Sequence, residues 1–172
     1  LYQFGIRNGM ILLLNVVTAL VIGLLTEQLA VVAVFTLSFM VLRGYTGGYH
    51  SDSRIFCYLG SNLVLLVPVY TQAVFYKTSL AWLLAVLLVS AGIIFLLSPM
   101  HSKNRKLDKE EQKHFGRKAR LIAALELAVL GILWHAGQIP YAYAVYTGIC
   151  ITALFMLVGK AQLWIQSHTE NG

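Results

Sequence analysis

Charged residues are scarce in this chain of 172 residues. Asp, Glu, Lys and Arg make up 12% of it, about half of their usual share, whereas 58% of the chain is hydrophobic. The mean hydropathy is +0.72. These residues supply too little polar surface for a water-soluble fold, which disfavours a soluble enzyme, a disordered tail and a nucleic-acid-binding module. The 2 cysteines are too few for a disulfide framework.

Long uncharged runs are what the chain has in abundance. Charged or polar residues separate six apolar spans: 8–26, 28–42, 55–76, 78–100, 121–139 and 141–159. Five of these spans contain no charged residue, and the span 121–139 contains one, Glu126. A helix needs about 20 apolar residues to cross a bilayer, and only the second span is clearly shorter. That span is tilted, continues past Arg43, or fails to cross. Because the runs are continuous rather than alternating, we predict an all-α polytopic membrane protein with about six transmembrane helices.

The basic residues lie almost entirely in alternate loops. Six crossings place the N-terminus, the 43–54 loop, the 101–120 loop and the C-terminus on one side, which holds every one of the 13 Lys and Arg residues except Lys77. The positive-inside rule assigns this side to the cytoplasm of a multi-pass cell-membrane protein. The net charge of +6 is then explained by topology, which weakens a nucleic-acid partner further. Aromatic residues near span ends suit the membrane interfaces: Trp82, Tyr141, Tyr143, Tyr146 and Trp164.

Local signals mark several helix boundaries. Ser79 is a candidate N-cap before the fourth span, and Pro140 suits the first turn of the last helix. Asp108 and Glu111 form a capping-box pattern. We therefore expect a helix that begins at about Lys109 and continues into the fifth span. No linker divides the chain into domains.

The loop between the second and third spans has an unusual composition. From Arg43 to Arg54 it holds three glycines, two tyrosines and His50. Glycines allow positive φ angles and close approach of the backbone to another chain. Candidate N-caps for the third helix follow: Ser51, Asp52 and Ser53. Cys57 then lies in the first or second turn, where the positive end of the helix dipole favours a thiolate.

His50 and Cys57 are candidates for nucleophilic catalysis. Along one straight helix they would be about 10 Å apart, which is too far for proton transfer. The pair works only if the helix begins after His50, so that the glycine loop folds the imidazole back over the thiol. A neutral histidine can then accept the thiol proton and later act as a general acid. On spacing alone, a structural role for both residues remains the default interpretation.

This pattern resembles the signature of the accessory gene regulator protein B (AgrB) family, membrane cysteine endopeptidases of Gram-positive bacteria: Arg43-x-x-x-Gly47-Gly48-x-His50-x6-Cys57. The basic 101–120 loop, with its Leu-Asp-Lys-Glu-Glu core, and the two closing helices match the family layout. The resemblance covers essentially the whole chain, residues 1–172, as a single transmembrane peptidase domain. Little of the N-terminal lead of such relatives is present, which bears on substrate engagement and not on the catalytic pair.

The resemblance implies a specific activity. Cys57 is the nucleophile and His50 the base in a catalytic cytoplasmic loop. They cleave off the acidic C-terminal part of a short AgrD-like propeptide and hold the N-terminal part as a thioester. A Cys or Ser of the propeptide then closes a thiolactone or lactone ring, giving a quorum-sensing signal peptide. The implied partners are this propeptide and the lipid bilayer, and no cofactor is implied. The oligomeric state is left open, with a homodimer as one alternative.

Other residues of the loop have two interpretations each. Arg43 holds a substrate carboxylate or marks the end of the second helix. Gly47 and Gly48 shape the loop, or their N–H groups stabilise an oxyanion. Asp52 orients His50 or caps a helix. No third catalytic residue is assigned.

Ionisable residues outside the loop have simpler interpretations. Glu126 is an ionisable group inside a span, and such groups are often functional, but pairing with Arg120 or Lys118 is favoured. Cys150, among apolar neighbours, is expected to pack in the core. Three histidines lack metal-ligand spacing, and we predict no metal site: His101, His114 and His135. The basic 101–120 loop attracts either an acidic propeptide or anionic lipid headgroups.

Two functions of other classes remain as alternatives. One is a small transporter or channel subunit with Glu126 as an ion site and His50 in a gate. The other is a non-catalytic membrane scaffold, in which neither His50 nor Cys57 matters. Serine, zinc and aspartyl intramembrane proteases are disfavoured, because the chain has no Gly-x-Ser-x-Gly, His-Glu-x-x-His or Gly-x-Gly-Asp motif.

Overall fold

The structure, a computed structural model, describes residues 2–47, 54–100 and 109–169, and side chains over 13–47, 58–100, 110 and 112–165. Within these residues the chain forms helices and no strand, which confirms the all-α prediction. The helices are α1 (Tyr2–Leu25), α2 (Leu29–Thr46), α3 (Arg54–Tyr70), α4 (Gln72–Lys77), α5 (Leu80–Leu97), α6 (Lys109–His135) and α7 (Ile139–Thr169).

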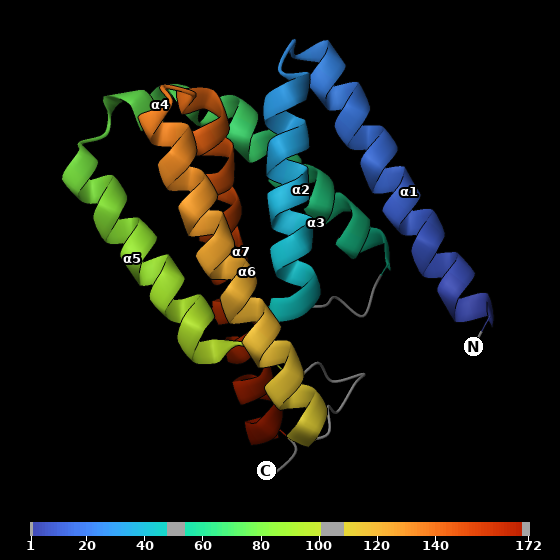
Figure 1. Ribbon diagram of the computed structural model, residues 1–172. Coiled ribbons are helices and arrows are strands. Elements are labelled where there is room, and N and C mark those ends of the chain that lie inside the picture. The colour runs from blue at the N-terminus through green and yellow to red at the C-terminus, as the bar shows by residue number, and fades with distance from the viewer. Residues whose placement is uncertain (1, 48–53, 101–108, 170–172) are drawn as a thin grey trace.

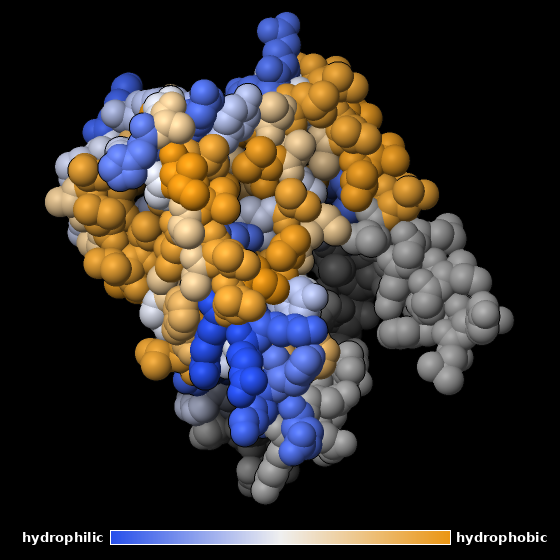
Figure 2. Space-filling view, viewed as in Figure 1, coloured by the Kyte–Doolittle hydropathy of each residue, from blue (hydrophilic) through white to orange (hydrophobic). Residues whose placement is uncertain are grey.

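The helices have the length and surface of a membrane protein. Over the described residues, α2, α5 and α7 are each long and apolar enough to span a bilayer, and two shorter apolar stretches lie in α1 and α3. Apolar side chains cover much of the visible surface (Figure 2). Leu25 is 80% exposed and Leu88 is 71% exposed. Such exposure is costly in water and favourable in lipid, so the composition and the surface agree.

Two helices form the centre of the bundle. α2 and α7 lie side by side, α1 and α3 pack on one flank, and α5 and α6 on the other (Figure 1). One buried cluster joins α2, α5, α6 and α7 around Leu42, Ile94 and Met156. A second joins α1, α2, α3 and α7 around Phe35 and Ala144. Because both clusters share α2 and α7, these two helices fix the position of everything else.

The predicted alternation of loops is present in the fold. The end of the bundle that holds Thr46, Arg54, Leu97 and Lys109 also holds both chain termini (Figure 1). We call it the basic end. The α1–α2 turn, α4 and the α6–α7 turn lie at the other end, the opposite end. α2 continues past Arg43, which was one of the alternatives for the short second span.

Several predicted boundaries are confirmed. α6 begins at Lys109, although Asp108 and the side chain of Glu111 lie outside the described residues. Pro140 is in the first turn of α7. Ser79 precedes α5 in an extended conformation, but its hydroxyl makes no capping hydrogen bond. Helix starts can therefore be read from the sequence even where a cap bond does not form.

The third predicted span is wrong in one respect, because it forms two helices instead of one. α3 ends at Tyr70, and α4 begins after Thr71. Pro68 lies inside α3, where it cannot donate a backbone hydrogen bond and its ring crowds the preceding turn. The Thr71 hydroxyl donates to the Val67 carbonyl oxygen at 2.7 Å and also hydrogen-bonds with the Tyr143 hydroxyl, which holds the break against α7.

Candidate functional site

The predicted catalytic loop lies between the end of α2 and the start of α3, at the basic end. α3 begins at Arg54, so Cys57 lies in its first turn, as predicted from the sequence. His50, Gly48 and Asp52 lie outside the described residues, as does the Cys57 side chain. Their mutual geometry therefore stays a prediction.

The beginning of the loop is held tightly. Thr46 is fully buried, and its carbonyl oxygen accepts a hydrogen bond from the Met100 backbone N–H at 2.9 Å. Gly47 follows with a φ of 73°. A Cβ atom at this position would lie 2.7 Å from the Met100 carbonyl oxygen. Both the positive φ and the close approach require glycine, which supports the loop-shaping interpretation of Gly47.

Arg43 points into the bundle beside aromatic rings. Its guanidinium carbon lies 4.7 Å from the centre of the Phe155 ring in α7 and 5.8 Å from that of Phe39 in α2. The side chain is half-buried. A guanidinium over an aromatic face is stabilised electrostatically, more strongly where water is excluded. Arg43 therefore ties the last turn of α2 to α7, a role that neither of its two predicted interpretations included.

The start of α3 is tied to α1. The Tyr58 hydroxyl, one residue after Cys57, is 2.9 Å from the Thr18 hydroxyl oxygen. The Thr18 hydroxyl also donates to the Leu14 carbonyl oxygen at 2.8 Å. The two helix ends that flank the predicted catalytic loop are thus each anchored to a different neighbour.

The first half of α6 runs beside the end of α2. The ring centres of Tyr45 and Phe115 are 6.3 Å apart, and the Lys118 Nζ lies 5.9 Å from the Tyr45 ring centre. Gly116 is buried, and a Cβ atom there would lie 2.9 Å from the Pro99 Cδ. The chain that follows α5 is therefore held between α2 and α6, next to the loop.

The predicted pairing of Glu126 is wrong. Its Oε2 atom accepts a hydrogen bond from the hydroxyl of Ser38 in α2 at 2.7 Å. Arg120 instead donates from Nε to the Phe95 carbonyl oxygen at 3.2 Å, and Lys118 lies over Tyr45. Both cations lie closer to the start of α6 than Glu126 does, and they contact the ends of α5 and α2 at the basic end. The carboxyl lies deeper in the bundle, where a hydroxyl donor reduces the cost of burial.

This contact is possible because α7 leaves room for it. A Cβ atom at Gly148 would lie 2.5 Å from the Ser38 Oγ atom. Ser38 is 7% exposed, so its hydroxyl is enclosed by α2, α6 and α7. The Ser38–Glu126 hydrogen bond therefore links α2 to α6 at the point where Gly148 of α7 packs against Ser38.

The remaining predicted residues lie away from the loop. Cys150 is half-buried in α7, within hydrogen-bonding reach of Ser90 and Tyr146. Among the described residues, no group of three or more His, Cys, Asp or Glu side chains is placed to hold a metal ion.

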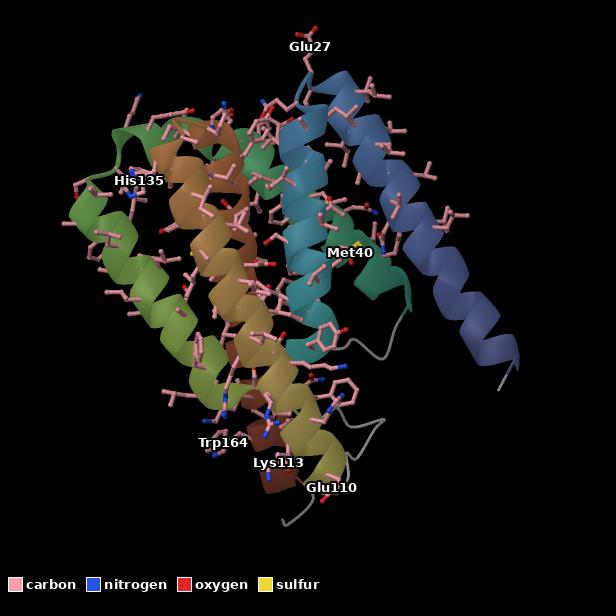
Figure 3. All side chains as sticks on the ribbon, in the orientation of Figure 1. Glu27, Met40, Glu110, Lys113, His135 and Trp164 are labelled. Atoms are coloured by element: carbon pink, nitrogen blue, oxygen red, sulfur yellow. The ribbon has the colours of Figure 1, made fainter. Side chains whose placement is uncertain are left out.

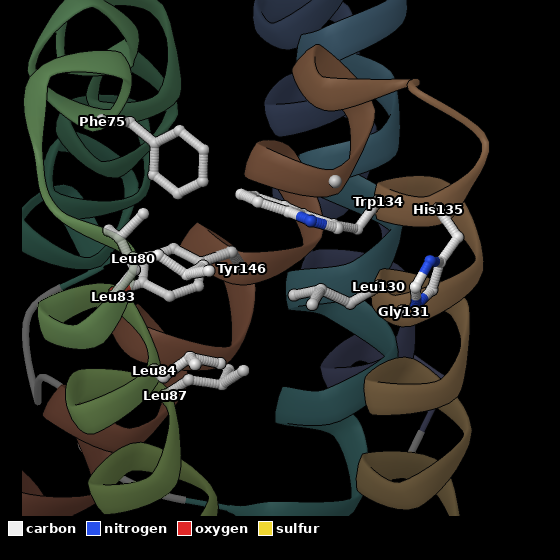
Figure 4. Close-up of a pocket in the computed structure, with 11 residues that line it drawn as sticks. Phe75, Leu80, Leu83, Leu84, Leu87, Leu130, Gly131, Trp134, His135 and Tyr146 are labelled. Carbon is white, nitrogen blue, oxygen red and sulfur yellow. The ribbon is translucent and has the colours of Figure 1, made fainter.

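An apolar cavity of about 270 Å³ lies at the opposite end of the bundle (Figure 4). Leucines of α5 line it together with Phe75, Trp134 and Tyr146, and His135 is at its edge. The Phe75 ring centre is 5.4 Å from that of Tyr146 and 6.3 Å from that of Trp134. This cavity is far from the loop and contains no candidate nucleophile, so we do not assign catalysis to it.

Sequence reasoning missed three residues that position the site. The Met100 backbone N–H donates to the carbonyl oxygen of Thr46, next to Gly47. The Phe155 ring lies beside the Arg43 guanidinium, and the Ser38 hydroxyl donates to Glu126. Pro99 did signal the end of a helix, because proline disfavours helix in the residue before it. No sequence signal connects any of these residues with its partner.

The fold and the anchored loop define a class: an all-α membrane protein whose Gly-rich loop joins two helices at its basic end. A sequence model of the family Accessory gene regulator B matches residues 1–157, and the chain belongs to this family. A relative from Staphylococcus intermedius, described as Accessory gene regulator protein B, is 26% identical over 156 residues, which are 88% of this chain and 80% of the relative. No solved structure matches. Membership places the protein in accessory gene regulator quorum-sensing signal processing.

Proposed function

We propose that the protein is a membrane cysteine endopeptidase that cleaves an AgrD-like propeptide and promotes its cyclisation. The observation that carries the proposal is the start of α3 at Arg54. It puts Cys57 near the start of a helix. The sequence predicts His50 in the loop before that helix. The positive end of the helix dipole favours the thiolate that such a reaction needs.

The proposed cleavage is an acyl transfer. His50 takes the proton of the Cys57 thiol, and the sulfur attacks the carbonyl carbon of the scissile bond. The C–N bond breaks, the leaving amine takes the proton from His50, and the C-terminal part departs. The N-terminal part stays on Cys57 as a thioester.

Ring closure follows without net hydrolysis. An internal Cys or Ser of the propeptide loses its proton to His50 and attacks the thioester carbon. The bond to the Cys57 sulfur breaks, and that sulfur regains the proton. A tethered nucleophile has a high effective concentration, and a site beside the apolar bundle limits competing water.

The fixed ends of the loop support this arrangement. Gly47 is held against Met100, and Tyr58 is held against Thr18. Preorganised groups need little rearrangement in the transition state, and small displacements of reacting atoms are costly in rate. Loop ends held at both sides are therefore what a catalytic loop requires.

The test uses the full chain in membranes with a synthetic propeptide. Cys57→Ala should abolish cleavage, and Cys57→Ser should be nearly inactive, because histidine ionises a hydroxyl less readily than a thiol. His50→Ala should lose about 10²–10⁴-fold in rate. Cys150→Ala is the matched control: it removes the other cysteine, which lies in α7, and should retain cleavage.

Trapping separates the two half-reactions. A propeptide whose internal Cys is replaced by Ala should form the thioester on Cys57 but not cyclise. Intact mass should show the adduct, and hydroxylamine should release it. If Cys57→Ala still cleaves the propeptide, the peptidase proposal is wrong. Substrate flux that survives this substitution would favour a transporter, and indifference to both His50 and Cys57 would favour a scaffold.

A further inference from the structure

A groove of about 590 Å³ opens between the end of α5 and the first half of α6. Its floor includes Pro99, and its α6 side carries three cations: Lys113, Arg117 and Arg120. We call it the basic groove. It lies near the basic end, where Lys113 is on the lower half of α6 in Figure 3.

The three cations form one stripe along α6. Lys113 and Arg117 are four residues apart and Arg117 and Arg120 three apart, so they are neighbours on the helix surface. Like charges at such spacings destabilise a helix. None of the described residues that line the groove is acidic. Arg120 donates from Nε to the Phe95 carbonyl oxygen at 3.2 Å, which holds its guanidinium at the groove. An anion bound here would relieve the repulsion.

Exposed leucines lie at the groove and beside it. Leu96 lines it and is 83% exposed, and Leu121, one residue after Arg120, is 59% exposed. Figure 2 shows the hydrophilic patch over the lower part of α6 bordering directly on the apolar surface. Charge and hydrophobicity therefore change over a short distance, as they do along a phospholipid.

We propose that the basic groove binds an anionic glycerophospholipid. Its headgroup phosphate pairs with the stripe of Lys113, Arg117 and Arg120, and its acyl chains lie along Leu96 and Leu121. Basic pockets between transmembrane helices recognise lipid headgroups in this way, and arginine suits phosphate because its donors form a planar fork. An acidic peptide would pair with the charges of the stripe but would make no apolar contact with the exposed leucines. A lipid makes both contacts and is therefore favoured. The proposal stands independently of the peptidase reaction.

Native mass spectrometry of the full chain tests the proposal. The protein is released from mixed micelles with equal amounts of phosphatidylglycerol and phosphatidylcholine, and the wild type should retain phosphatidylglycerol preferentially. Removal of two cations in Lys113→Gln/Arg117→Gln should weaken this retention by about 25-fold, at about 5-fold per charge. Arg120 is left intact because it bonds to the α5 backbone. Both substituted side chains are exposed, and circular dichroism checks the fold.

The matched control is Lys118→Gln/Lys160→Gln. It removes the same charge near the same end, but neither residue lines the groove. Phosphatidylglycerol retention should stay within about 2-fold of the wild type, because neither side chain lines the groove and so neither pairs directly with the phosphate. Equal losses in both pairs would overturn the proposal, because the effect would then be non-specific.

Two further arms distinguish other ligands. Leu96→Gln should weaken phosphatidylglycerol retention several-fold without a change of charge. Inorganic phosphate should not displace the lipid, and full displacement would show a phosphate site without an acyl component. A Glu-rich peptide should bind no better to the wild type than to Lys113→Gln/Arg117→Gln. A peptide that binds the wild type selectively and resists phosphatidylglycerol would identify a peptide site and overturn the lipid proposal.

Discussion

At the scale of single residues, the Ser38–Glu126 hydrogen bond is a polar contact between α2 and α6, beside Gly148 of α7. A buried carboxyl without a donor is costly, and each buried group that loses its partner costs about 1–3 kcal/mol. Ser38 supplies that donor at 2.7 Å. The contact belongs to the packing of α2, α6 and α7, and α2 leads into the proposed catalytic loop.

Ser38→Ala should therefore destabilise the protein by about 1–3 kcal/mol, because it leaves the Glu126 carboxyl without its donor. The measurement is unfolding in detergent micelles. Thr36→Ala is the matched control in the same helix, since the Thr36 hydroxyl donates to the Val32 carbonyl oxygen one turn away within α2. If the two variants are equally stable, the hydrogen bond to Glu126 contributes nothing.

Gly148→Ala should be destabilising too, but for a steric reason. The added Cβ would lie 2.5 Å from the Ser38 Oγ atom and 3.2 Å from its Cβ. Overpacking of this kind costs about 1–3 kcal/mol. Gly131→Ala in α6, where nothing lies within 4 Å, should instead be neutral or stabilising. Adding Ser38→Ala to Gly148→Ala should recover part of the loss, and strict additivity would contradict the clash.

The importance of Glu126 could be predicted from its rarity within an apolar span, but its partner could not. Ser38 is 88 residues away in the sequence, and its approach depends on a glycine in a third helix. Tyr143 shows the same limit. It was predicted at a membrane interface, yet it is 3% exposed and its ring centre lies 4.8 Å from that of Phe75. Proximity to a span end says little about which face of a helix a residue occupies.

At the scale of elements, the starts of α6 and α7 follow from a capping-box pattern and from Pro140. The predicted span 141–159 stops short of the end of α7 at Thr169. The division of α3 from α4 does not follow from the sequence, because the apolar run continues through the break at Thr71. The start of α3 could be predicted because the Gly-rich loop cannot favour helix. The contact that holds the start of the loop could not be predicted from the sequence. Met100, after α5, reaches Thr46 and Gly47 only because whole helices pack together.

Gly47→Ala tests that attachment. The substitution forces an L side chain into a φ of 73° and puts its Cβ 2.7 Å from the Met100 carbonyl oxygen. Residues held in such backbone regions cost about 1–3 kcal/mol. Because Gly47 begins the catalytic loop, we expect propeptide cleavage to fall at least about 10-fold, consistent with the cost of small misplacements. The measurements are the cleavage rate and unfolding in detergent.

The matched control is Gly44→Ala, three residues earlier in α2. Nothing lies within 4 Å of a Cβ atom at Gly44, and alanine stabilises a helix interior by about 0.5–1 kcal/mol relative to glycine. Cleavage by this variant should match the wild type. A Gly47→Ala protein as active as Gly44→Ala would mean that the loop tolerates a different path.

At the scale of the whole molecule, alternate loops gather the functional features at one end. The start of the catalytic loop, the chain after α5 and the basic half of α6 all meet at the basic end. The opposite end carries Lys77 and the apolar cavity. The fold thus brings together residues that the sequence separates by whole helices, and the charge asymmetry predicts which side of the membrane each end occupies.

Topology reporters test this orientation. Fusions after residues 51 and 110 should read cytoplasmic, and a fusion after residue 77 should read outside, because all 13 basic residues except Lys77 belong to one set of loops. The fusion after residue 77 is the internal control, since it lies between the other two in the chain and must give the opposite signal. A fusion at 51 that reads outside would reverse the orientation of the catalytic loop. A propeptide made in the cytosol would then have to cross the bilayer before it met Cys57, and direct access to the proposed site would be ruled out.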